Sequence, residues 1–174
     1  MQPDSVPSPT RSSERHARLE IHPSPGVHNA LWYYAQVTGG YARVMRNAII
    51  IQLARYTPQL ALKNALYRRL GMRVGPHASV GLMVMVDVFF PQDISLGENC
   101  VIGYNSTILC HEFTRYEWRR GPVVVGRDVT IGANSTILPG VVIGDGATVS
   151  AMSLVNRDVA PGAFVGGVPI RPLR

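Results

Sequence analysis

Aliphatic residues recur at every sixth position through residues 123–155. The positions are Val125, Ile131, Ile137, Ile143, Val149 and Val155. Small or β-branched residues stand two positions earlier, at Val123, Val129, Ser135, Val141, Ala147 and Ser153. A period of six is not helical, but it agrees with the two-residue alternation of strands if the chain turns sideways every sixth residue. Such hexapeptide repeats are typical of a parallel β-helix, in which three hexapeptides form one triangular coil around the aliphatic residues.

The same pattern begins earlier in the chain and is interrupted twice. Its earlier members are Val74, Val80, Val86, Leu96, Ile102 and Ile108. The step from Val86 to Leu96 is ten residues, which predicts a four-residue excursion around Phe89, Phe90 and Pro91. The step from Ile108 to Val125 is seventeen residues, which predicts that an eleven-residue loop at 111–121 leaves the coil. Four coils are expected, at 74–86, 96–108, 125–137 and 143–155.

Glycine follows many of these aliphatic residues, for example at Gly126, Gly132 and Gly144. We expect it there because glycine permits backbone angles that a corner of the coil requires. The predicted fold is therefore an all-β repeat domain over residues 74–174.

The first 73 residues lack the repeat and divide into two parts. Residues 1–28 are rich in Pro, Ser and charge, which predicts a flexible tail. Residues 29–73 are expected to form a helical cap, with helices over 31–38 and 41–56. For the next helix we expect Thr57 as N-cap, Pro58 at the first position and an apolar stripe. The stripe consists of Leu62, Leu66 and Leu70.

The net charge of +6 is concentrated in this N-terminal part. Residues 1–73 carry ten basic and three acidic side chains, whereas residues 74–174 carry seven basic and eight acidic ones. Residues 41–73 hold seven basic residues and no acidic one, which suits peripheral contact with anionic lipid, a lipid-linked substrate or cofactor phosphates. We favour a simpler interpretation, a cap with solvated charges, because the open end of a coil must be covered. No nucleic-acid-binding motif accompanies the charge, so no nucleic-acid partner is expected.

Two features predict a cytoplasmic protein. Cys100 and Cys110 do not make a disulfide framework, and no signal peptide or membrane-spanning run is recognisable.

His111 is the strongest candidate for a catalytic residue. It stands where the chain leaves the predicted coil, and imidazole is the usual general base near neutral pH. Glu112 either orients the ring or is solvated. Cys110 invites a role as nucleophile, but cysteine also suits small buried positions, which we favour.

Three stretches together resemble the hexapeptide-repeat acetyltransferases, in the branch of galactoside, maltose, serine and xenobiotic acetyltransferases. These are Cys-His-Glu with the loop that follows, the repeat at 125–147, and Gly-Gly-Val-Pro-Ile-Arg at 166–171. The resemblance covers about residues 74–171. It implies a left-handed β-helix, a homotrimer with active sites between subunits, and acetyl-CoA lying along the coil, with no metal.

The resemblance also implies roles for single residues. His111 matches the loop histidine that deprotonates the acceptor, and the backbone N–H of Ala133 matches the oxyanion donor. Ala133 and Ala151 match corners that contact pantetheine, although Ser150-Ala151-Met152 replaces the more usual Gly-Ala-Gly. Arg157 and Arg171 stand where basic side chains meet the cofactor phosphates.

The expected function is an acetyl-CoA-dependent O- or N-acetyltransferase acting on a sugar or glycan. Asp87 and Asp93 are candidates for binding the acceptor, but acidic residues are also common at corners of such coils. Two alternatives are a gamma-class carbonic anhydrase, which needs three histidines around a metal, and a non-enzymatic β-helix scaffold.

Overall fold

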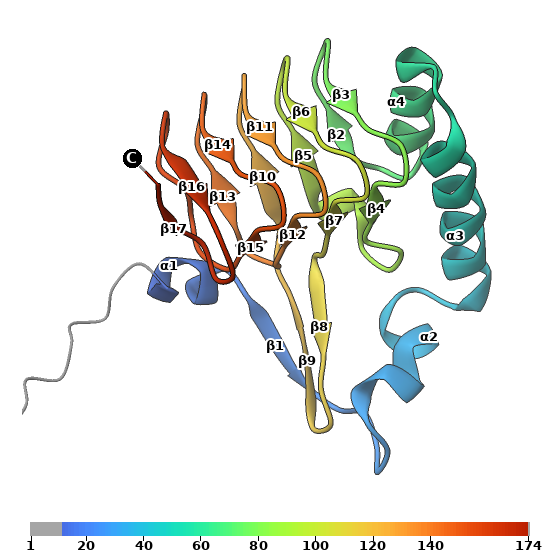
Figure 1. Ribbon diagram of the computed structural model, residues 1–174. Helices are drawn as coiled ribbons and strands as arrows, with labels where there is room; N and C mark the ends of the chain where they lie inside the picture. Colours follow the sequence, from blue (N-terminus) through green and yellow to red (C-terminus); the bar gives the residue numbers. More distant parts are fainter. Residues whose placement is uncertain (1–11, 174) are drawn as a thin grey trace, which may run out of the picture.

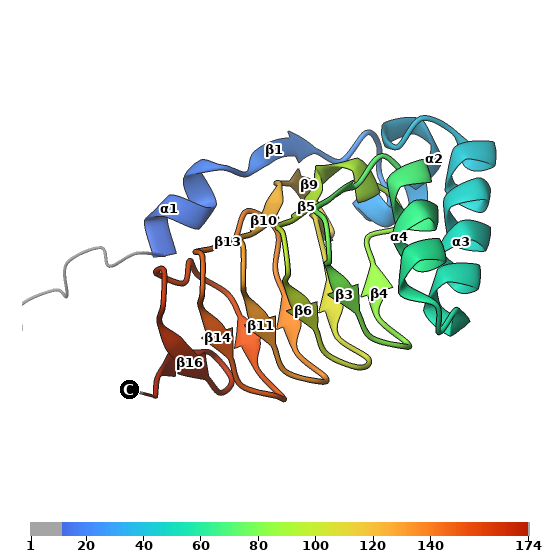
Figure 2. The same cartoon turned by 90° about the horizontal axis from the view of Figure 1, so that it is seen from above.

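The computed structural model describes residues 12–173, and in it the chain winds into a three-walled prism of parallel strands (Figures 1 and 2). The first wall contains β2 (Arg73–Val74), β5 (Ile94–Leu96), β10 (Val123–Val125) and β13 (Val142–Ile143). The second contains β3 (Ser79–Val80), β6 (Val101–Ile102), β11 (Thr130–Ile131), β14 (Thr148–Val149) and β16 (Phe164–Gly166), with β17 (Arg171–Pro172) antiparallel to β16. The third contains β4 (Met85–Val86), β7 (Thr107–Ile108), β12 (Thr136–Ile137) and β15 (Leu154–Val155).

The inward aliphatic residues stack in columns along the prism, as the six-residue period predicts. Ile131 pairs in register with Ile102 on one side and with Val149 on the other. All three side chains are buried. Full burial of such a side chain stabilises a fold by about 1.5–3 kcal/mol, so these columns form the main apolar core. The predicted register and the four predicted coils are confirmed.

The corner glycines serve a different purpose from the one predicted. Positive φ values fall two residues after each glycine, for example at Asn99 after Gly97 and at Asn134 after Gly132. A Cβ atom on Gly97 would lie 2.4 Å from the backbone carbonyl carbon of Gly126 in the next coil. Glycine is therefore required because neighbouring coils approach too closely for a side chain.

Helices cover the open end of the prism next to β3 and β4 (Figure 2). They are α3 (Tyr41–Tyr56) and α4 (Leu60–Arg69), whereas the 3-10 helix η1 (Ala30–Tyr33) and α2 (Tyr34–Val37) precede them and η1 contacts β9 (Glu117–Arg120). Lys63 Nζ donates to the carbonyls of Val80 and Gly81 at 3.0 and 2.9 Å, and Asn64 Nδ2 donates to that of Ala78 at 2.8 Å. These side chains satisfy carbonyls that a further coil would otherwise pair, so residues 41–73 are a cap, as favoured from sequence.

Two details of the predicted α4 are wrong. Thr57 is the C-cap of α3, and α4 begins at Leu60 after Gln59. Only part of the leucine stripe faces the prism: Leu66 packs against the core and Leu70 is buried in it, but Leu62 is 51% exposed and Lys63 is fully buried in its place. The reason is the surface beneath the helix, whose unpaired carbonyls must be hydrogen-bonded when buried.

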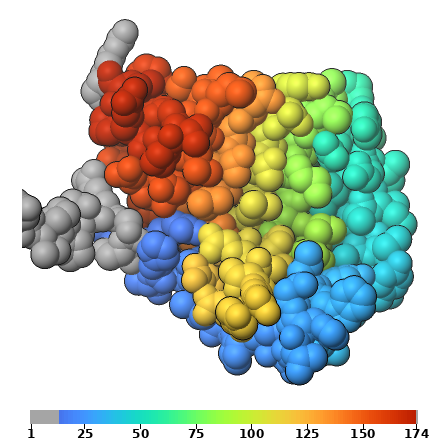
Figure 3. Space-filling model, turned by 60° about the horizontal axis from the view of Figure 1, so that its bottom comes forward, coloured from blue at the N-terminus to red at the C-terminus, as the bar shows by residue number. Residues whose placement is uncertain are grey.

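The loop at 111–121 is a β-hairpin of β8 (His111–Phe113) and β9 (Glu117–Arg120), which projects from the prism (Figure 1). An N-terminal strand, β1 (Glu20–Pro23), pairs antiparallel with β9 and completes a three-stranded sheet. Figure 3 shows the hairpin lying beside residues 25–40 on one face of the molecule.

The prediction of a flexible tail over residues 1–28 is therefore wrong for residues 12–28, while residues 1–11 lie outside the described part. After helix α1 (Ser12–Ala17), the chain continues directly into β1. Arg15 is buried, donates to the carbonyl of Pro139 at 2.6 Å and pairs with Glu112. Arg18 pairs with Asp158 at 2.7 Å. The composition of residues 1–28 predicts a tail because it does not show the residues that hold this segment, which are all distant in the sequence.

Candidate active site

His111 and Asp87 form a hydrogen-bonded pair where the hairpin leaves the prism. The distance from His111 Nδ1 to Asp87 Oδ2 is 2.5 Å. Asp87 Oδ2 also accepts from the backbone N–H of Cys110 at 2.6 Å. Its Oδ1 accepts from the N–H groups of Phe89 and Phe90 at 2.9 and 2.8 Å. The carboxylate thus has four donors and is 1% exposed.

The electrostatics of the pair fix the roles of the two imidazole nitrogens. Burial alone would raise the pKa of Asp87, but the hydrogen bond from His111, its charge and the backbone N–H groups outweigh burial and lower this pKa. An ionised carboxylate only accepts hydrogen bonds, so Nδ1 is the donor, and in the neutral imidazole the lone pair is on Nε2. Within residues 12–173, Nε2 has no hydrogen-bond partner. The ring is therefore oriented with a free basic nitrogen.

Aromatic side chains surround the ring. Phe89 contacts it edge-on, with ring centroids 4.8 Å apart, and Phe113 lies at 5.1 Å. Phe90 lies at 6.3 Å and stacks on Trp118 at 5.8 Å. His111 is left with a side chain that is 16% exposed. This partly dry setting strengthens the interaction with Asp87.

A signal for this pair is present in the sequence, although the predictions from sequence did not include it. Both interruptions of the repeat follow strands of the third wall, β4 and β7, and these strands pair with Val86 opposite Ile108. The two excursions must therefore emerge side by side. Asp87, directly after Val86, is consequently placed next to Cys110 and His111.

Glu112 does not orient the imidazole. Successive residues of a strand point to opposite sides, and Glu112 points away from the ring. Its carboxylate pairs with Arg15 and, at 3.4 Å, with Arg119. The structure therefore replaces Glu112 with Asp87 as the partner of His111, and Glu112 joins the hairpin to the N-terminal segment.

The predicted acceptor contacts of Asp87 and Asp93 do not agree with their surroundings. Asp87 is buried beneath the ring, with both oxygens engaged. Asp93 accepts two hydrogen bonds from Arg120, at 2.5 and 2.9 Å, and the guanidinium of Arg120 lies 4.6 Å from the centroid of the Phe90 ring. Asp87 therefore supports His111, whereas Asp93 fixes Arg120.

Cys110 is fully buried. Burial, with the charges of Asp87 and Asp93, raises the pKa of its thiol far above the ordinary value. A thiol with so high a pKa is a poor nucleophile, which agrees with the structural role that we favoured from sequence.

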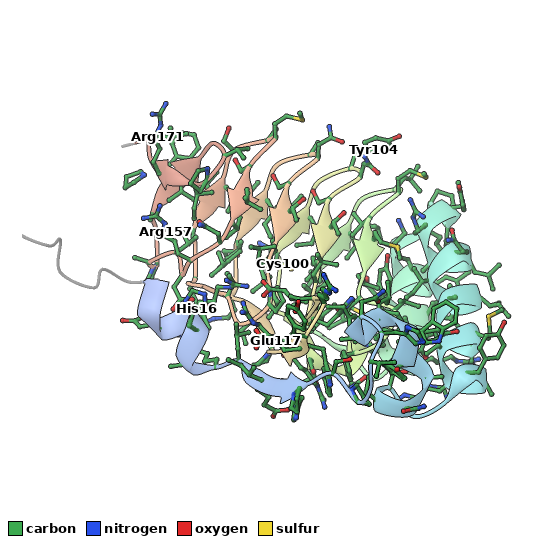
Figure 4. The ribbon with its side chains drawn as sticks, turned by 90° about the horizontal axis from the view of Figure 1, so that it is seen from below. His16, Cys100, Tyr104, Glu117, Arg157 and Arg171 are labelled. Atoms are coloured by element: carbon green, nitrogen blue, oxygen red, sulfur yellow. The ribbon has the colours of Figure 1, made fainter. Side chains whose placement is uncertain are left out.

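Ala133 lies on a different edge of the prism from His111. Its corner joins the second wall to the third, and stacks on the Tyr104 corner through Asn134 N–H and the carbonyl of Tyr104 at 2.9 Å. Figure 4 places Tyr104 across the coil from Glu117 of the hairpin. Within the described chain, no acceptor is found for the N–H of Ala133. One protomer therefore holds the predicted base and the predicted oxyanion donor apart.

The predicted cofactor contacts run toward the C-terminal end of the prism. Ala151 occupies the same corner as Ala133 one coil further on, where Met152 N–H donates to the carbonyl of Ala133 at 2.9 Å. Arg157 and Arg171 lie at the last coil (Figure 4) and line one cleft of about 370 Å³ with residues 167–170. The structure thus brings the two arginines together.

Two features are absent from residues 12–173. No group of three or more His, Cys, Asp or Glu side chains there could hold a metal ion. None of the helices in that part is both long and apolar enough to cross a membrane.

Comparison with known proteins identifies the family. The repeat described as "Bacterial transferase hexapeptide (six repeats)" matches residues 122–157, and "Hexapeptide repeat of succinyl-transferase" matches residues 93–109. Two relatives carry the name "Putative acetyltransferase". YvoF of Bacillus subtilis is 56% identical over 155 residues, covering 88% of this chain and 89% of the relative. SAR0816 of Staphylococcus aureus is 41% identical over 143 residues, which cover 82% of this chain and 88% of the relative.

Solved structures support the fold. A hexapeptide-repeat-containing acetyltransferase of Vibrio cholerae, complexed with acetyl coenzyme A, has a TM-score of 0.63 at 24% identity and covers 83% of this chain and 96% of its own. A galactoside acetyltransferase in complex with coenzyme A has a TM-score of 0.62 at 19% identity. The match covers 98% of this chain and 91% of the galactoside acetyltransferase. The predicted left-handed parallel β-helix with a helical N-terminal cap is confirmed. The chain belongs to the hexapeptide-repeat acetyltransferase family.

Proposed function

We propose that this protein is an acetyl-CoA-dependent O- or N-acetyltransferase in which His111 is the general base. The observation that carries the proposal is the His111–Asp87 pair, which leaves Nε2 without a partner within residues 12–173, on a side chain that is 16% exposed at the start of the hairpin. The names of the relatives supply the group transferred, and the structural neighbours were solved with acetyl-CoA or CoA.

The pair performs the proton transfers of a direct acyl transfer. Nε2 removes the proton from the acceptor hydroxyl or amine as that atom bonds to the thioester carbonyl carbon. The buried charge of Asp87 stabilises the imidazolium that forms. When the carbon–sulfur bond breaks, Nε2 returns its proton to the departing CoA sulfur. No covalent enzyme intermediate is needed, and the un-ionised Cys110 thiol has no part in the reaction.

The separation of His111 and Ala133 supports a homotrimer. In this arrangement the hairpin of one protomer faces the Ala133 corner of its neighbour, whose free backbone N–H then stabilises the oxyanion. A sugar or glycan hydroxyl is the acceptor that we infer. The use of acetyl-CoA also agrees with the predicted cytoplasmic location.

The corners at Ala133 and Ala151 lead to Arg157 and Arg171, where we place the CoA phosphates. We expect Arg171→Ala to weaken CoA binding roughly fivefold, about 1 kcal/mol, because a charge-assisted contact is lost. Titration of CoA by calorimetry measures the change. The matched control is Arg69→Ala, an exposed arginine of α4 at the other end of the prism. Equal affinities in the two variants would place the phosphates elsewhere.

A panel of hydroxyl and amine acceptors with detection of released CoA thiol tests the proposed function. We expect acceptor-dependent thiol release, together with a thermal shift on adding CoA. If millimolar CoA or acetyl-CoA produces neither a shift nor a heat of binding, the non-enzymatic scaffold becomes the better interpretation.

The outer face of α3 supports peripheral contact with a membrane. Its large exposed side chains are 41–65% accessible and consist of Tyr41, Met45, Ile49, Leu53 and Tyr56. They occupy one side of the helix, while Val44, Ile51 and Ala54 are buried on the other. With Arg46, which is exposed on the same helix, this face has the composition of a helix lying on an anionic lipid surface.

We therefore expect binding to vesicles that contain phosphatidylglycerol but not to phosphatidylcholine vesicles, and a steep loss of binding with salt. Ile49→Glu should reduce sedimentation with the vesicles, whereas Val27→Glu, at a residue that is 95% exposed, should not. If the wild-type protein does not sediment with either vesicle at low salt, the segment acts as a cap alone.

A further inference from the structure

The segment that precedes the helical cap holds the hairpin along one side. Strand β1 runs beside β9 (Figure 1), with Glu20–Pro23 opposite Glu117–Arg120. Before this strand, Leu19 lies against the residue at which the hairpin returns to the coil, because a Cβ atom on Gly121 would lie 2.6 Å from Cδ2 of Leu19. We call residues 12–23 the N-terminal clasp. The clasp contacts both the length and the base of the hairpin.

Arg15 is the part of the clasp that joins the hairpin to the coil. Its side chain is 6% exposed. Nε donates to the carbonyl of Pro139, in the coil, at 2.6 Å, and Nη2 donates to the carboxylate of Glu112, in the hairpin. A guanidinium presents its donors in a rigid plane. One buried side chain therefore fixes the base of the hairpin against the coil.

This contact lies one residue from His111. The hydrogen bond to Asp87 at 2.5 Å fixes Nδ1 of the ring. The direction of Nε2 also depends on the backbone of residue 111, which begins β8 directly before Glu112. Displacing a reacting group by about 1 Å can lower a rate by about 10²-fold. The position of Glu112 therefore matters to the reaction, although its side chain points away from the ring.

Glu112 has a second partner, which makes its position depend on Arg15. Its Oε2 lies 3.4 Å from Nη1 of Arg119, on the facing strand of the hairpin. The side chain of Arg119 is 33% exposed and also pairs with Glu117 at 2.5 Å. Of the two ion pairs that Glu112 makes within residues 12–173, only this more exposed one remains if Arg15 is removed. The base of the hairpin would then be released from the coil.

Resting on the proposed function, we propose that Arg15 is a positioning residue for acetyl transfer. Through Glu112 it sets where the hairpin presents Nε2 of His111, while Asp87 sets the tautomer. The hexapeptide repeats match residues 93–109 and 122–157, so this contribution comes from outside them. Arg15 acts on the rate without touching the acceptor or CoA.

Arg15→Met tests the proposal, because methionine keeps an unbranched side chain and removes the charge. We expect kcat to fall by roughly 10–100-fold while the Kd of CoA stays within about twofold. Arg15→Lys, which keeps the charge but not the planar fork, should recover part of the loss. Arg18→Met is the matched control, because the side chain of Arg18 binds Asp158 and the carbonyl of Gly140. Its kcat should stay within about twofold of the wild-type value.

Glu112→Gln breaks the same pair from the side of the hairpin and leaves the bond from Arg15 to Pro139 in place. It also decides the question if Arg15→Met does not fold. The two single variants and Arg15→Met/Glu112→Gln should lower kcat by similar factors, since all three lose one shared interaction. Effects that multiply in the double variant, or wild-type kcat in both single variants, would contradict the proposal.

A spectroscopic measurement separates this proposal from the proposed function. In protein with isotope-labelled histidine, the Nδ1–H that His111 donates to Asp87 gives an NMR signal, assigned by its loss in His111→Ala. The signal should shift in Arg15→Met and Glu112→Gln but not in Arg18→Met. If the wild-type protein acetylates no acceptor, the proposed function fails, while this shift still supports the positioning of the ring. An unchanged signal in both Arg15→Met and Glu112→Gln would overturn the role of Arg15.

Discussion

Replacing His111 with alanine is expected to lower turnover by about 10²–10⁴-fold, the usual contribution of a positioned general base. Nε2 is the nitrogen left free by the bond to Asp87, and within the described residues no other side chain shares its position against Phe89 and Phe113. CoA affinity should stay within about twofold, because the contacts proposed for CoA lie on another edge of the prism. Initial rates of thiol release and calorimetric titration measure the two quantities.

The control for this variant is His77→Ala. His77 is an exposed corner residue with φ of 57°, far along the chain from the hairpin. It should retain normal turnover. Turnover of His111→Ala close to that of the wild-type protein would remove His111 from the mechanism.

Asp87→Asn is expected to lower turnover by about 10²-fold or more while leaving CoA binding unchanged. The amide keeps the shape of the side chain, but an NH₂ group in the place of Oδ2 can accept neither from Cys110 N–H nor from His111 Nδ1–H. The imidazole then favours the tautomer with its proton on Nε2, which cannot act as a base. Asp93→Asn is the matched control, because Asp93 binds Arg120 and does not contact the ring.

The same substitution should also change how stability depends on pH. The folded-state pKa of Asp87 is lowered below the ordinary value of 3.8. Its stabilisation is therefore fully present above pH 3.8 and is lost as the pH falls through the folded-state pKa. Urea unfolding should show Asp87→Asn to be less stable than the wild-type protein at pH 6, with a smaller difference at about pH 3. A difference that does not change with pH would contradict an ionised Asp87.

The coil could be predicted because its periodicity repeats one environment many times. Each aliphatic residue of the repeat faces the same kind of neighbour, so Ile102, Ile131 and Val149 could be placed in one column without coordinates. The excursion loop and His111 followed from the same arithmetic. The helical cap followed from the need to cover an open coil.

Single, non-repeated contacts could not be predicted in this way. Arg15 is buried against Pro139, which is 124 residues away, and nothing in the composition of the first 28 residues indicates this. Lys63 and Asn64 are buried because they face carbonyl groups, whose positions follow only from the folded coil. The partnership of Asp87 with His111 lies between these cases, because it required both interruptions to be placed on one wall.

Strand β1 has a consequence for how the chain can be shortened or extended. Because β1 pairs with β9, the hairpin that begins at His111 has no open edge on that side. A truncation that begins at residue 29, where the composition changes, would expose the backbone donors and acceptors of β9. Unpaired strand edges recruit other chains, so such a shortened protein would tend to self-associate through the β8–β9 hairpin.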